Sequence, residues 1–324
     1  MSARFFNTFG DLLIRCCVTD GKYIWFTSDY VNAVFKMELE NMVIISVKFL
    51  PFGSAFQMNT VGMIALDGNK ITMYLKNTVR GHRIVYFDID SETFSIPCIE
   101  FPDTAWGDSY DQDEDYLYIP TENSCKIGKI NKRNYSVEYI DLESECGHFS
   151  TIKKIGNDYA LVGVKNNEFI IYESDGKTRK VSMNIDGYKV SIPGNFQACA
   201  IVCVSDEVFI IPQWANSILR VNIRTMDIKI HGQLYNDYDF LRMPLFTSVL
   251  VRDNGNIMAY MNGYGCWVEF DSSMNILKKK MMTNFKEKLE GAIGDNIRKI
   301  VPQNDYIVES NIVSLKLFIN AIEA

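Results

Sequence analysis

YIWFT at residues 23–27 is the first of six short strand-forming runs that recur along this chain of 324 residues. The other five are ITMYL at 71–75, YLYIP at 116–120, YALVG at 159–163, VFIIP at 208–212 and IMAYM at 257–261. The starts of successive runs lie 48, 45, 43, 49 and 49 residues apart. A near-constant period of short strands is typical of a β-propeller, in which each blade buries its faces against its neighbours alone.

Each repeat offers four strand-like segments. In the fifth repeat ACAIVCV at 198–204 precedes VFIIP, and ILRVNI at 218–223 and MDIKIHG at 226–232 follow it. Turn-forming residues separate the segments, and several of them are continuously apolar, as strands covered on both faces are. We therefore predict an all-β fold of six four-stranded blades. The rival assignment, two packed antiparallel sheets, would not require so regular a period.

The pattern breaks after residue 283, so we predict a propeller over 1–283 and a C-terminal appendage over 284–324. The appendage begins with apolar residues at every fourth position, which indicates a helix: Phe285, Leu289, Ile293 and Ile297. NDYIVES at 304–310 then favours a strand. The alternative is a seventh, truncated blade whose missing strand is RFFNT at 4–8, joining the two ends of the chain.

Composition narrows the class of partner. Hydrophobic residues make up 47% of the chain and aromatic residues 13%, enough to pack the faces of six blades. The net charge of −7 disfavours a general nucleic-acid or anionic-membrane surface, which would need a basic field. No run of 18 apolar residues is present, so we expect no membrane span.

The eight cysteines fall mostly inside strand-like runs, and no pair has the spacing of zinc ligands. Cys199 and Cys203 share a strand face but lie about 13 Å apart at the rise of a strand, too far for a bridge. We therefore expect buried thiols in a reducing compartment. The N-terminal stretch has neither an apolar signal core nor a cleavage site, and we expect a cytoplasmic protein.

The repeats resemble those of six-bladed propellers of the NHL-repeat and SMP-30/gluconolactonase-like group. The resemblance covers residues 9–282 as architecture, and no fingerprint of one family is present. It implies a ligand face made by the loops that join successive blades and by those between the second and third strands. Fold resemblance gives a location only, so function has to be argued from the site residues.

An aromatic residue precedes the innermost strand of each blade. Those taken as ligand-binding candidates are Phe56, Trp106, Phe149, Phe196 and Phe246. They would either wedge between blades as packing or form an aromatic platform for a sugar or peptide. The second set of loops adds Trp214, Asn216 and Tyr264 as ligand-binding candidates.

Two chemistries remain open for an enzyme. A lyase could use His148 or His82 as general base near neutral pH, with Arg80 or Arg83 holding a carboxylate.

A lactonase-like hydrolase would hold a divalent metal on carboxylates or amides near the strand starts. The candidates are Asp11, Asn59, Asp108 and Asn195. The acidic run at 111–115 lacks the glycine and glutamate of an EF-hand loop, and we expect a solvated turn there.

The sequence favours a non-catalytic binding module that recognises a glycan or a peptide at the face around the central channel. The alternatives are the metal-dependent lactonase-like hydrolase and the His-dependent lyase, so whether the chain is an enzyme stays open. The amphipathic segment 309–323 could dock a protein partner or a second copy of the chain.

Overall fold

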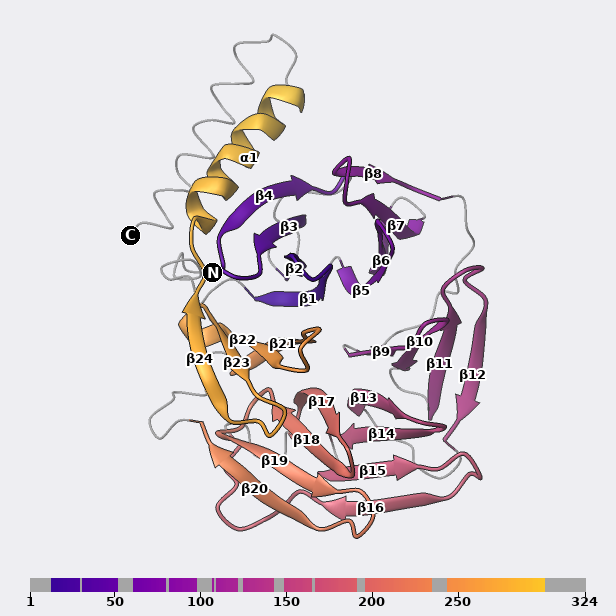
Figure 1. The fold of residues 1–324 in the computed structure, drawn as a ribbon. Coiled ribbons are helices and arrows are strands. Elements are labelled where there is room, and N and C mark those ends of the chain that lie inside the picture. The colour runs from indigo at the N-terminus through magenta and orange to yellow at the C-terminus, as the bar shows by residue number, and fades with distance from the viewer. Residues whose placement is uncertain are drawn as a thin grey trace.

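The computed structural model describes residues 13–29, 31–51, 61–79, 82–97, 107, 109–121, 125–142, 149–164, 167–190, 196–234 and 244–300. These residues form six four-stranded antiparallel sheets arranged as the blades of a ring (Figure 1). In each sheet the strand order follows the chain from the innermost strand outward. The chain is therefore a six-bladed β-propeller, as the period of the repeats predicts.

The first three blades occupy the N-terminal half of the chain. Blade 1 contains β1 (Ile14–Thr19), β2 (Tyr23–Ser28), β3 (Ala33–Glu38) and β4 (Ile44–Phe49). Blade 2 contains β5 (Val61–Asp67), β6 (Lys70–Val79), β7 (His82–Asp88) and β8 (Thr93–Ser95). Blade 3 contains β9 (Asp111–Gln112), β10 (Tyr116–Pro120), β11 (Lys126–Asn131) and β12 (Val137–Asp141).

The other three blades follow, and one helix ends the described part of the chain. Blade 4 contains β13 (Phe149–Ile155), β14 (Asp158–Gly163), β15 (Glu168–Tyr172) and β16 (Thr178–Ser182). Blade 5 contains β17 (Ala198–Val204), β18 (Glu207–Pro212), β19 (Ser217–Asn222) and β20 (Ile228–Gln233). Blade 6 contains β21 (Phe246–Val251), β22 (Ile257–Met261), the 3-10 turn η3 (Asn262–Tyr264), β23 (Cys266–Phe270) and β24 (Ile276–Met281), and α1 (Phe285–Ile300) comes after it.

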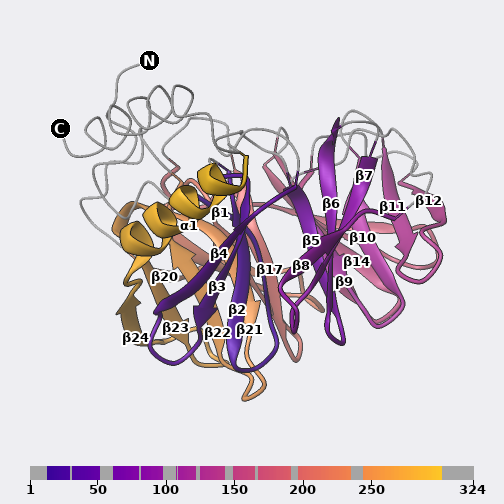
Figure 2. The same ribbon diagram turned by 90° about the horizontal axis from the view of Figure 1, so that it is seen from above.

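The core is divided among the blade interfaces. Each of the six neighbouring pairs of blades encloses one cluster of buried apolar side chains. The second strand of blade 1, YIWFTS, is buried at five successive positions because neighbouring blades cover both of its faces. Figure 2 shows the ring from the side, with the strands running from one face of the ring to the other. This arrangement explains why the strand runs in the sequence alternate only partly.

The ring closes where blade 6 packs on blade 1. Ser248 Oγ of β21 donates to the carbonyl of Ile14 in β1 at 3.0 Å, and Arg252 pairs with Glu40 beyond β3. The innermost strands of the two blades lie side by side (Figure 1). Since blade 6 meets blade 1 directly, the ring closes with six blades, and the seven-bladed alternative is wrong.

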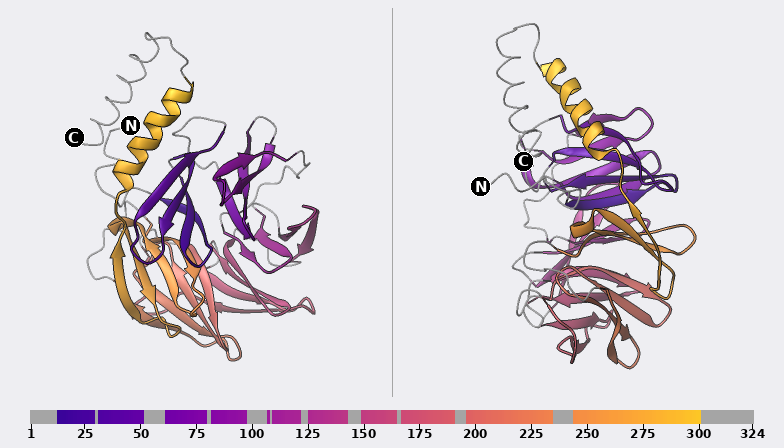
Figure 3. Two further views of the ribbon diagram at one scale, coloured as in Figure 1. Left: turned by 45° about the horizontal axis from the view of Figure 1, so that its top comes forward. Right: turned by 90° about the vertical axis from the view of Figure 1, so that its left-hand side faces the viewer.

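The C-terminal helix covers the outer edge of blade 1. After β24 the chain crosses to this edge, where Thr283 N donates to the carbonyl of Met42 at 2.9 Å and Ile44 N donates to the carbonyl of Thr283 at 3.1 Å. Helix α1 then runs along β4 on the outside of the ring (Figure 3). Leu289 and Ile293 are buried in the cluster between blades 6 and 1, so the predicted helical stripe is confirmed over these positions.

The cysteines differ from expectation at one position. Cys125 is disulfide-bonded, with its partner outside the described residues, so the expectation of unpaired thiols is wrong there. The described free cysteines are Cys16, Cys17, Cys199, Cys203 and Cys266. Within the described residues no helix is long and apolar enough to cross a membrane.

We predict that α1 contributes to the stability of the ring closure. Leu289→Ala should lower the free energy of unfolding by about 2–5 kcal/mol, because it leaves a cavity in a packed cluster. Glu290→Ala, an exposed position on the same helix, is the matched control and should change it by less than about 0.5 kcal/mol. Urea denaturation measures both. Equal effects of the two substitutions would contradict a packing role for the helix.

Candidate functional site

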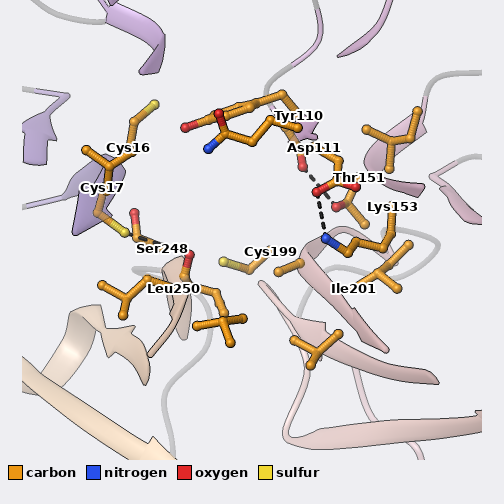
Figure 4. A pocket seen from close by; sticks show the side chains of 18 of the residues that line it. Cys16, Cys17, Tyr110, Asp111, Thr151, Lys153, Cys199, Ile201, Ser248 and Leu250 are labelled. Atoms are coloured by element: carbon orange, nitrogen blue, oxygen red, sulfur yellow. Dashed lines mark hydrogen bonds and ion pairs between the residues drawn. The ribbon is translucent and has the colours of Figure 1, made fainter. Parts of the chain in front are cut away.

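A cavity of about 470 Å³ lies at the centre of the ring. Its lining comes from the innermost strands of all six blades and from residues next to them. Figure 4 shows residues of blades 1, 3, 4, 5 and 6 around the cavity. The lining extends along most of β1, from Arg15 to Thr19, and along β21 from Thr247 to Val251. The cavity therefore lies between the innermost strands, along most of the length of β1 and β21.

Bulges in the innermost strands shape the lining. Five of the six innermost strands shift register after their first residue, which leaves one residue without a partner in the ladder. In β1, β17 and β21 these residues are Arg15, Cys199 and Thr247, and all three line the cavity. A bulge bends the strand and redirects a side chain, so the same local irregularity places functional groups from three blades at the centre.

The wall from blades 3 and 4 is polar. Asp111 of β9 and Lys153 of β13 form an ion pair of 2.7 Å between the two blades. The second carboxylate oxygen of Asp111 accepts the backbone N–H of Lys154 at 2.8 Å. Above this pair, Ser109 Oγ donates to Thr151 Oγ1 at 2.8 Å. Figure 4 shows Asp111, Thr151 and Lys153 together on one side of the cavity.

The opposite wall carries thiols and aliphatic side chains. Cys17 of β1 and Cys199 of β17 both line the cavity, and their sulfur atoms point into it in Figure 4. Burial, with a smaller contribution from the thiols of Cys16 and Cys199, raises the pKa of Cys17 well above its ordinary value. Burial also raises the pKa of Cys199 to about 12, although Arg15 opposes the shift. Both groups are therefore neutral thiols at physiological pH.

A second polar cluster stands behind the polar wall and holds blades 3 and 4 together. Asp113 accepts a hydrogen bond from Lys154 Nζ at 2.6 Å and another from Tyr118 OH at 2.8 Å. Burial acts to raise the pKa of Asp113, but these two bonds and two backbone N–H groups outweigh it and lower the pKa to about 2. Because Lys154 follows Lys153, this cluster also fixes the strand that carries the cavity's ammonium group.

Three of the predicted aromatic residues are buried between strands and do not line the cavity. Phe149, Phe196 and Phe246 each belong to an apolar cluster between blades. The Phe246 ring lies 6.3 Å from that of Phe270, and the Phe196 ring 5.9 Å from that of Tyr188. This is the packing alternative that the sequence left open, and a role in ligand binding stays a prediction for all three.

The structure describes all three loop candidates of blades 5 and 6. Trp214 Nε1 donates to Gln197 Oε1 at 2.9 Å. Asn216 is buried, and its side-chain oxygen accepts from Ser217 Oγ at 3.0 Å. Tyr264 lies in η3 and is 43% exposed. None of these three lines the cavity, and their binding role also stays a prediction.

Several candidates lie outside the described residues. They are Phe56, Trp106, Arg80, His148 and the segment 309–323. The four proposed metal ligands, Asp11, Asn59, Asp108 and Asn195, lie outside them as well. His82 and Arg83 belong to β7, but their side chains are not part of the description. Among the side chains that are described, no group of three or more His, Cys, Asp or Glu could hold a metal ion.

The sequence reasoning missed Asp111, Lys153, Cys17 and Cys199 as cavity residues. The expectation of a solvated turn over 111–115 is wrong for Asp111, which belongs to β9 and lines the cavity. Their positions in the repeat could have identified them, because all four lie in the strand-like run that precedes the second strand of their own blade. Charged or thiol side chains in an innermost strand are candidates for the channel.

Comparisons with known proteins agree with this fold. Virginiamycin B lyase from Staphylococcus aureus, solved as a catalytically inactive histidine-to-alanine variant with quinupristin, is 13% identical over 86% of this chain and 88% of that one, with a TM-score of 0.55. The WD40 repeats of RRP9 are 12% identical over 84% and 81%, with a TM-score of 0.54. At these identities the likeness shows the fold alone. No protein-family model and no curated protein matches the sequence.

We predict that the channel thiols react slowly in the folded chain. A thiol with a pKa of about 12 is ionised to roughly one part in 10,000 at pH 8, and the thiolate is the nucleophile. An unfolded thiol with a pKa of about 8.5 is roughly one quarter ionised at pH 8. Iodoacetamide followed by mass spectrometry should therefore label Cys199 on the order of a thousandfold more slowly in the folded chain than in the urea-unfolded chain. Labelling at equal rates would contradict the burial of this thiol.

A second prediction concerns acid stability. The pKa of Asp113 is depressed from 3.8 to about 2, so its contribution to stability is present above about pH 4 and is lost as the pH falls towards 2. Asp113→Asn should lower the urea midpoint at pH 7, and the difference from wild type should shrink between pH 4 and 2. Glu114→Gln, the exposed neighbour, is the control. A difference that does not change with pH would contradict this assignment.

Proposed function

We propose that this chain is a non-catalytic binding module that admits part of a peptide ligand to its central channel. The observation that carries the proposal is the cavity of about 470 Å³ lined by all six blades. Ligand pockets in proteins usually have volumes of about 300–1,000 Å³ and combine apolar walls with a few fixed polar groups. The Asp111–Lys153 pair and the aliphatic wall opposite it meet that description.

The lining favours a peptide over a glycan. Sugar sites commonly present aromatic faces to the ligand. Among the described lining residues Tyr110 is the only aromatic, and its hydroxyl donates to the carbonyl of Ile64 at 2.6 Å. The aliphatic residues Ile201, Val202 and Leu250 instead provide a surface for an apolar side chain.

The described residues give less support to a hydrolase or lyase. A metal-dependent lactonase would need several carboxylates or amides converging on the axis. In the described lining Asp111 is the one carboxylate, and it already pairs with Lys153 and accepts the backbone N–H of Lys154. Assays of lactonase and lyase activity, with and without divalent metal, test these two alternatives.

The test is a thermal-shift screen of peptides and oligosaccharides, compared between wild type and Ala200→Trp. Ala200 lines the cavity, so the indole should fill it and abolish the shift. A ligand at a hundredfold its dissociation constant should add about 2.7 kcal/mol of apparent stability to wild type.

Ile276→Trp is the matched control, because this exposed residue lies on the outer strand β24. Peptide binding that is lost in Ala200→Trp and kept in Ile276→Trp would support the proposal. Binding that survives in both variants, or turnover of a lactone in the presence of metal, would overturn it.

A further inference from the structure

The chemistry of the cavity walls specifies the ligand more closely. One wall is formed by aliphatic residues of blades 1, 5 and 6, among them Val18, Val202 and Leu250. The thiols of Cys17 and Cys199 continue this wall and are neutral because burial raises their pKa. The surface therefore offers dispersion contacts without charge, which suits an aliphatic side chain.

The charges in the lining are compensated. Lys153 Nζ lies 2.7 Å from Asp111 Oδ1. Arg15, on the opposite side of the ring, pairs with Asp29 at 3.8 Å. Arg15, Lys153 and Asp111 are the charged residues of the described lining, so each of them already has a partner of opposite sign. An ionic ligand group would lose hydration without meeting an uncompensated charge, which is costly.

The Asp111–Lys153 pair offers a donor and an acceptor side by side. The carboxylate of Asp111 can accept a further hydrogen bond, and the ammonium of Lys153 has three donors, of which the pair uses one. Gln112 adds a buried side-chain oxygen with no hydrogen-bond partner, on the same wall. A neutral amide presents the complementary set, an N–H for Asp111 or Gln112 and a carbonyl for Lys153.

We propose that the central cavity selects a neutral peptide amide next to an aliphatic side chain, with the amide against Asp111 and Lys153 and the side chain against the wall of Val202 and Leu250. This inference rests on the proposed function and specifies its ligand. The cavity discriminates against a free carboxylate or a free amine at the same place. The ligand is therefore an internal or capped segment of a peptide.

The experiment uses four small probes that differ by one feature each. N-acetyl-L-leucinamide is neutral and aliphatic, N-acetyl-L-leucine is anionic, L-leucinamide is cationic, and N-acetylglycinamide lacks the side chain. Ligand-detected NMR titration of the full chain gives the affinities. N-acetyl-L-leucinamide should bind about tenfold or more tightly than each of the other three, since burial of a leucine side chain or avoidance of one unpaired charge is worth at least that factor.

Two variants test the polar wall. Lys153→Met should weaken N-acetyl-L-leucinamide about tenfold, the usual effect of losing a hydrogen bond to a charged group. Lys177→Met is the matched control, because it breaks a 2.6 Å pair with Asp175 on the surface, outside the cavity, and should leave the affinity unchanged.

Val251→Asp provides a test that does not disturb the core. Val251 lines the cavity and is 57% exposed, so the variant should fold. Its new carboxylate should favour the cationic probe, so the affinity for L-leucinamide relative to that for N-acetyl-L-leucine should rise about two- to fivefold over wild type, the size of an exposed ion pair. An unchanged ratio of these two affinities in this folded variant would overturn the proposal.

The remaining outcomes separate this inference from the proposed function. If N-acetyl-L-leucine or L-leucinamide binds wild type best and Ala200→Trp abolishes that binding, the neutral-amide selection is wrong and peptide binding in the channel stands. The same holds if the probes fail while a charged peptide binds and is blocked by Ala200→Trp. If N-acetyl-L-leucinamide binds Ala200→Trp as well as wild type, its site lies elsewhere and this inference falls. If no peptide or probe binds, both proposals are wrong.

Discussion

The blades of this ring bury their faces against one another, so the facing sides of blades 1 and 6 are buried only because blade 6 closes on blade 1. Each interface holds one apolar cluster, and the last of them joins residues from both ends of the chain, such as Ile14 and Trp267. The hydrogen bond from Ser248 to Ile14 and the ion pair of Arg252 with Glu40 align the two blades. Helix α1 then covers the edge of blade 1 that would otherwise expose β4.

The central cavity is a consequence of the same geometry. The innermost strands of the six blades surround the axis of the ring with their edges. The side chains there cannot interdigitate as they do between the faces of neighbouring blades. Bulges at Arg15, Cys199 and Thr247 turn extra side chains towards the axis. The result is a space whose chemistry depends on single positions in different repeats, with a polar wall at Asp111 and Lys153 and an aliphatic wall opposite.

Much of the fold could be predicted because the repeats can be recognised in the amino-acid sequence alone. The runs that begin at Tyr23, Tyr116 and Val208 became second strands of blades, and the stripe of Leu289 and Ile293 became the buried face of α1. The site could not be predicted in the same way. Phe149 and Phe246 are as compatible with packing as with ligand binding until their neighbours are known, and the structure packs both between blades.

The sequence by itself determined the strand period and the change to helical spacing after residue 283, because both are local patterns. The choice between six and seven blades was decided by the contact of blade 6 with blade 1. Only the tertiary structure decided which residues share the channel. Asp111 and Lys153 are 42 residues apart, and Cys17 and Cys199 belong to blades 1 and 5. Asp111 meets Lys153 because blades 3 and 4 pack side by side, and Cys17 and Cys199 share the cavity because the ring closes. Neither contact has a local signature in the sequence.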